Sequence, residues 1–92
     1  MSVIKLKDGF VVQKVGASYL AVAVGERADN FNALIRMNET GAFLWNCLAK
    51  GEKSEEELLA ALLGEYDVAE DVARTDVARF VEQLKKGGLV EE

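Results

Sequence analysis

The most constraining feature of this sequence is the run MNETGAFLW at residues 37–45, where an extended segment changes into a helix. The preceding residues 31–37 alternate apolar with other side chains, which is typical of a half-buried strand. From Gly41 onward the apolar residues recur at helical spacing. Asn38 lies at the junction, and its short side chain suits it to accept a hydrogen bond from a free N–H group of the first helical turn. The sequence therefore predicts a strand, a cap and a helix in direct succession.

The other elements follow from propensity and turn signals. Residues 10–15 and 19–24 are rich in β-branched and apolar side chains and are separated by a short turn, so they predict a hairpin. Helices are expected from residue 39 to about 50, ending at Gly51, and from a capping box that begins at Ser54. A third helix is expected to start near residues 68–70, with its cap open between Asp67 and Ala69, and to end at the glycines 87–88. Residues 89–90 are read as a short closing strand or a packed tail.

This order predicts an α+β, winged-helix-like domain, with a three-stranded antiparallel sheet followed by three helices. The chain has 92 residues, which suits a single domain over residues 1–92. Strand alternation assigns two faces to the third strand. The core face is expected to carry Phe31, Ala33, Ile35 and Met37, and the other face Asn32, Leu34 and Arg36.

Composition argues against an enzyme. The sequence has no histidine and one cysteine, Cys47, whereas zinc sites and general base catalysis depend mostly on these residue types. We therefore expect no catalytic residue, no metal and no cofactor. Cys47 falls in a helical pattern and is read as a buried or half-buried thiol in a reducing cytosol. With no signal peptide or long apolar run, the expected location is cytoplasmic, without membrane insertion.

Charge argues against nucleic-acid binding. The net charge is −5, and the third helix balances Arg74, Arg79, Lys85 and Lys86 against four acidic residues. A protein that binds a nucleic acid needs a cationic face that releases counterions. A winged-helix DNA-binding protein remains as an alternative, because its architecture is similar.

Four sequence blocks, at residues 37–45, 54–59, 65–68 and 84–89, resemble the PqqD family in order and spacing. The domain of this family is also called the RiPP precursor recognition element, and the resemblance spans residues 10–90. It implies a peptide-binding chaperone that holds the leader of a ribosomally made precursor peptide and presents it to a tailoring enzyme, often a radical S-adenosylmethionine enzyme. Members that serve pyrroloquinoline quinone synthesis usually carry Cys-Asp-Gly just after the first helix. Residues 48–51 here read LAKG, so another modified-peptide pathway is at least as well supported.

In the family, the leader adds to the third strand and lies in the groove against the third helix. The third strand here has no proline, and its edge suits such an addition. Of the third helix's two flanks, the one with Arg74 and Lys85 is the expected wall, because leader peptides often carry acidic residues. The alternative is that these are solvated charges in helical pairs. The predicted peptide-binding residues are Asn32, Ala33, Leu34, Ile35, Arg36, Arg74, Val77, Ala78, Val81 and Lys85.

A third reading uses the same strand edge for a different purpose. A structural subunit would pair edge to edge with a second copy of itself and form a homodimer. The sequence alone does not separate this reading from peptide binding.

Overall fold

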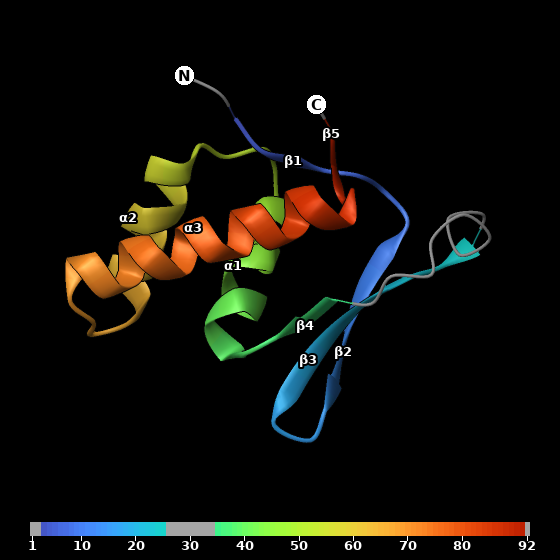
Figure 1. Ribbon diagram of the computed structural model, residues 1–92, viewed down its shortest axis with the longest axis horizontal. Coiled ribbons are helices and arrows are strands. Elements are labelled where there is room, and N and C mark those ends of the chain that lie inside the picture. Colours follow the sequence, from blue (N-terminus) through green and yellow to red (C-terminus); the bar gives the residue numbers. More distant parts are fainter. Residues whose placement is uncertain (1–2, 26–34, 92) are drawn as a thin grey trace.

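The computed structural model describes residues 3–25 and 35–91. Figure 1 shows the order of its elements. They are β1 (Lys5–Leu6), β2 (Phe10–Val15), β3 (Ser18–Ala23), β4 (Ile35–Met37), α1 (Glu39–Ala49), α2 (Glu55–Glu65), α3 (Glu70–Gly87) and β5 (Val90–Glu91). The predicted α+β class, with an antiparallel sheet followed by three helices, is confirmed. Among the described helices, none combines the length and the apolar character needed to cross a bilayer.

The main sheet has the strand order β2-β3-β4, and both pairings are antiparallel. The β2–β3 turn has Gly16 at its first central position with a φ of 62°, as two-residue hairpins of type II′ require. Figure 1 shows the turn end of this hairpin projecting away from the helices. β4 is an edge strand of this sheet and lies beside α3. Its outer edge is therefore where another strand could add to the sheet.

A second, two-stranded sheet joins β1 to β5, with Lys5 opposite Glu91 and Leu6 opposite Val90. The sequence predicted the closing strand as one of two alternatives. β1 was not predicted. Two residues are too few for a period of two to be recognised, so only the tertiary pairing defines this strand.

The core is formed by side chains from all three helices. The fully buried leucines are Leu44 of α1, Leu58 and Leu62 of α2, Leu84 of α3, and Leu89 just after α3. Figure 1 shows α3 crossing both other helices, and it packs against each of them. Strands β3 and β4 add Ala21, Ile35 and Met37 to the same core.

The predicted alternation of the third strand is confirmed where the structure describes it. Ile35 and Met37 are 5% and 4% exposed, while Arg36 between them is exposed. The four predicted strand residues 31–34 lie outside the described residues. Trp45 is buried. Cys47 is half-buried, as expected.

The junction between β4 and α1 has the predicted cap. The Asn38 Oδ1 accepts a hydrogen bond of 2.8 Å from the Gly41 N–H. Gly41 itself is buried, and a Cβ at this position would lie 3.1 Å from the Cβ of Met37. The close approach of helix and strand fixes the direction in which the chain leaves β4.

Replacing Asn38 with alanine should therefore lower the free energy of unfolding by about 0.5–2 kcal/mol, because one N–H of the first turn loses its acceptor. Urea denaturation followed by circular dichroism measures this change. Asn46→Ala is the matched control: Asn46 is exposed in the same helix, and alanine is the better helix former. Equal midpoints for the two variants would contradict the role of the cap.

The other two helices begin differently. α2 has the predicted capping box: Ser54 Oγ accepts from the Glu57 N–H at 3.1 Å, and Glu57 Oε1 accepts from the Ser54 N–H at 2.9 Å. For α3 the later of the two open starts is observed, since Ala69 is the N-cap and makes no side-chain cap bond. α3 ends at Gly88, whose φ of 73° is left-handed.

Candidate functional site

A hollow of about 340 Å³ lies where β4, the first turns of α1 and the middle of α3 meet. Its floor is apolar, because Met37, Leu44 and Phe80 are each 4% exposed or less. Its rim is polar and includes Ser18, Arg36, Thr40, Asp76, Arg79 and Gln83. An apolar floor with a few polar groups around it is the common construction of a binding site.

The backbone of β4 faces this hollow with one residue, Arg36. The Val24 N–H donates to the Gly9 carbonyl at 2.8 Å, so Gly9 and Val24 form a hydrogen-bonded pair of the β2–β3 ladder. Such pairs recur at every second residue of an antiparallel ladder, so the polar groups of Leu20 also point to β2. Arg36 lies opposite Leu20 on the other side. Its N–H and C=O must therefore point away from β3, toward the outer edge of the sheet.

A side chain of α3 confirms this direction. Gln83 Nε2 donates to the Arg36 carbonyl at 3.2 Å, from the outer side of β4. Within the described residues, β4 pairs with β3 alone. The outer edge of β4 thus offers one donor and one acceptor, and the acceptor already binds the Gln83 amide.

The charges at the rim are two guanidinium groups and one carboxylate. Arg36 and Arg79 line the hollow together with Asp76. Neither arginine side chain makes an ion pair or a hydrogen bond with another residue of the described part of the chain. The rim therefore has an excess of one positive charge, on a protein whose net charge is −5.

The predicted site residues fall into three groups. Asn32, Ala33 and Leu34 lie outside the described residues. Ile35 and Arg36 lie on β4, where Ile35 turns its side chain into the core and Arg36 lines the hollow. The five residues predicted on α3 lie on the other side of that helix or in the core, and the ten-residue set stays a prediction.

The α3 flank predicted as the wall lies next to α2. Arg74, Val77 and Ala78 line a separate hollow of about 170 Å³ with Glu55, Glu56 and Leu59 of α2. Val77 and Val81 are each 2% exposed and belong to the core. Lys85 is exposed, and helical spacing places it on the same flank as Arg74 and Ala78.

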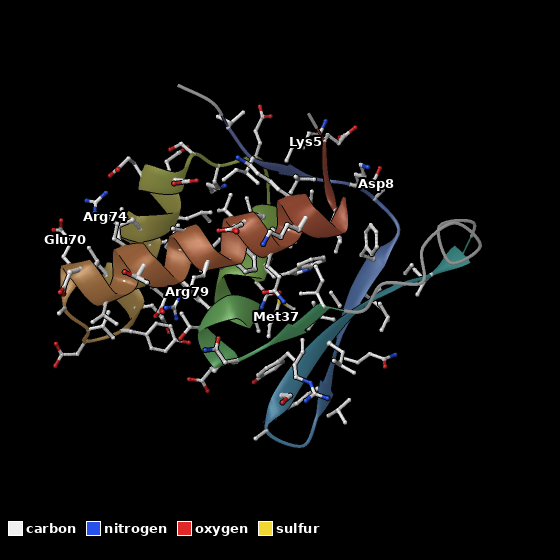
Figure 2. All side chains as sticks on the ribbon, viewed as in Figure 1. Lys5, Asp8, Met37, Glu70, Arg74 and Arg79 are labelled. Carbon is white, nitrogen blue, oxygen red and sulfur yellow. The ribbon has the colours of Figure 1, made fainter. Side chains whose placement is uncertain are left out.

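Arg74 is held by two carboxylates on the α2 side. Its Nη2 lies 3.1 Å from Glu70 Oε2, and its Nη1 lies 3.0 Å from Glu56 Oε1. Hydrogen bonds to Glu70 and then to Glu56 raise the pKa of Arg74 above its ordinary value. Figure 2 shows Arg74 beside α2 and Arg79 on the side of α3 nearer α1 and β4.

The flank that does face β4 carries Asp76, Arg79 and Gln83. Sequence periodicity defines both flanks of α3 equally well, because it fixes only which residues lie together. Which flank faces the sheet depends on how α3 crosses the other two helices. The sequence feature that did point to this site was strand alternation, which predicted that Arg36 faces outward.

The order of the helices and strands, the topology of the sheet and the geometry of the hollow together define a small winged-helix-like α+β domain. Its sheet has an accessible edge beside the third helix. The chain belongs to the PqqD family. The family described as Coenzyme PQQ synthesis protein D (PqqD) matches residues 20–90.

Two solved structures are similar to this chain over nearly all of its length. "TbiB1 in Complex with the TbiA(beta) Leader Peptide" has 22% sequence identity and a TM-score of 0.68, with 95% of this chain and 94% of that chain covered. "Lasso peptide synthetase B1 complexed with the leader peptide" has 21% identity and a TM-score of 0.69, with 97% and 98% covered. At these identities the likeness concerns the fold. A comparison with curated protein sequences gives no match.

Proposed function

We propose that this chain is a peptide-binding protein that holds the leader of a ribosomally synthesised precursor peptide as an added strand on β4. The observation that carries the proposal is the outward-pointing N–H and C=O of Arg36 at the edge of the apolar hollow. Membership of the PqqD family supports it, as does the fact that both similar structures are named as complexes with leader peptides.

The geometry explains how such binding would work. In strand addition, main-chain hydrogen bonds supply affinity and side-chain pockets supply selectivity. A guest strand beside β4 would bond to the Arg36 amide, would take the Arg36 carbonyl from the Gln83 side chain, and would place alternate side chains over Met37 and Phe80. The interface is small, so a dissociation constant between about 1 µM and 1 nM, or roughly −8 to −12 kcal/mol, is expected.

The role of the chain in this proposal is presentation, with no chemistry of its own. The bound leader would bring the rest of the precursor to a tailoring enzyme, and a radical S-adenosylmethionine enzyme is the partner we favour. Residues 48–51 support a pathway other than pyrroloquinoline quinone synthesis. Omitting this protein from a reaction of enzyme and precursor should then slow modification, most strongly at low precursor concentration.

The direct test is a titration of ¹⁵N-labelled protein with a synthetic leader from a short precursor gene adjacent to this protein's gene. The amide signals of β4 and of the α3 segment 76–83 should shift. A scrambled peptide of the same composition is the control. Shifts confined to other surfaces, or equal shifts with the scrambled peptide, would refute strand addition at β4.

Self-association through the same edge is the second candidate, because a second copy of β4 would meet the same Arg36 groups. Sedimentation at several concentrations, with and without the leader, separates the two. Dissociation of a dimer by the peptide would show that both use this edge. Duplex DNA binding has less support, since Arg74 pairs with Glu56 and Glu70 and Lys86 pairs with Glu82.

A further inference from the structure

We propose that the hollow beside β4 selects guests with an acidic side chain, and that Arg36 and Arg79 together bind its carboxylate. This inference rests on the proposed function and adds the chemical class of the guest. It also assigns two specificity-determining residues, of which Arg79 lies on the flank of α3 that was not expected to form the wall.

The first argument is the pairing of the arginines. Arg74 already has two carboxylate partners, Glu56 and Glu70. The guanidinium groups of Arg36 and Arg79 have no partner among the described residues, and both residues line the same hollow. A guanidinium group donates two parallel hydrogen bonds to a carboxylate, so two unpaired guanidinium groups at one rim form a ready binding site for such a group.

The second argument is the charge balance. Asp76 is the one acidic residue in the lining of this hollow. Two guanidinium groups and one carboxylate leave one positive charge, which a single guest carboxylate would neutralise.

The third argument is the register that the backbone imposes. Side chains directly opposite each other on paired strands lie on the same face, with their Cβ atoms about 4.5–5.5 Å apart. Arg36 points its side chain to the exposed face of the sheet. A guest that bonds to the Arg36 amide would place one residue opposite it, and an Asp or Glu there would meet the guanidinium group.

The negative charge of the rest of the protein restricts the binding of acidic peptides to this hollow. The chain has a net charge of −5, so an acidic peptide is repelled by most of the protein and attracted at this rim. Repulsion elsewhere suppresses non-specific binding and favours a single register.

The experiment is a selection from a display library of random 12-residue peptides on the immobilised protein. Wild type, Arg36→Gln, Arg79→Gln and Lys86→Gln are used in parallel. Lys86→Gln is the matched control, because it removes the same charge from an exposed position of the same helix that neither lines the hollow nor belongs to the predicted site. Wild type and Lys86→Gln should select peptides with Asp or Glu enriched at one position, and the other two variants should lose that enrichment.

The strongest selected peptide then gives a double-mutant cycle. Changing its acidic residue to the amide should weaken binding to wild type by about tenfold, and to Arg79→Gln by no more than about twofold. Circular dichroism of each variant checks that the fold is retained.

The outcomes separate this inference from the proposed function. Selected peptides that shift the Arg36 amide but show no acidic preference would overturn the inference and leave strand addition standing. An acidic preference that persists in both Arg36→Gln and Arg79→Gln would likewise overturn the inference alone. A selection that yields no peptide able to shift the β4 amides would overturn the proposed function and this inference with it.

Discussion

Replacing Arg36 with proline is expected to weaken leader binding by about 5- to 150-fold. Proline removes the N–H that points to the outer edge, and a guest carbonyl left without its donor costs about 1–3 kcal/mol. The β3–β4 ladder does not use this N–H, and proline is tolerated on edge strands in that orientation. Fluorescence anisotropy of a labelled leader peptide measures the loss.

Arg36→Gln is the control for this substitution, because it removes the charge and keeps the N–H. Comparing the two variants separates the backbone contribution from that of the side chain. Urea midpoints of both variants establish that the sheet is retained. Equal affinities for the proline and glutamine variants would mean that the guest does not bond to this amide.

Leu84→Ala is expected to lower the free energy of unfolding by about 2–5 kcal/mol, a large part of the roughly 5–15 kcal/mol typical of a domain. Leu84 is 0% exposed on α3, so its truncation removes apolar contacts and leaves a cavity. Urea denaturation measures the change.

Val72→Ala is its control on the same helix. Val72 is 51% exposed, and a surface substitution of this kind should change stability by no more than about 0.5 kcal/mol. A loss below about 1 kcal/mol for Leu84→Ala would be inconsistent with the packing of α3 against the other two helices.

Much of the fold was predictable because local signals agreed with the tertiary packing. Asn38, the Ser54 capping box and the glycine after α3 each satisfy free backbone groups of a helix end within three or four residues. Their effect is therefore visible in the sequence itself. The two faces of β4 followed from alternation, as the buried Ile35 and the exposed Arg36 confirm.

Features that depend on distant parts of the chain were less accessible. β1 exists because Lys5 and Leu6 meet Glu91 and Val90, at the other end of the chain. Of the two candidate caps of α3, Ala69 is used and Asp67 is not, and Ala69 makes no side-chain cap bond. In both cases the residues nearby in the sequence do not favour the observed structure over the other possibility.

The candidate site shows the same division. Alternation on a single strand predicted that Arg36 points outward together with Asn32 and Leu34, and Arg36 does line the hollow. The choice between the flanks of α3 required the crossing of three helices, and the flank with Arg74 lies beside α2. The direction of the Arg36 carbonyl, and the bond from Gln83 that reveals it, follow from ladder register and were beyond periodicity.

The hydrogen bond from Gln83 to Arg36 bears on solubility. Exposed strand edges pair with the same edge of identical chains, and repeated pairing leads to fibrils. The amide of Gln83 bonds to the Arg36 carbonyl, so any chain that pairs with this edge must first displace it. Two copies that pair antiparallel about Arg36 would also place their guanidinium groups opposite each other, which is unfavourable between adjacent strands. The Arg36 guanidinium group that would attract an acidic guest thus also disfavours pairing of this strand edge with its own copy.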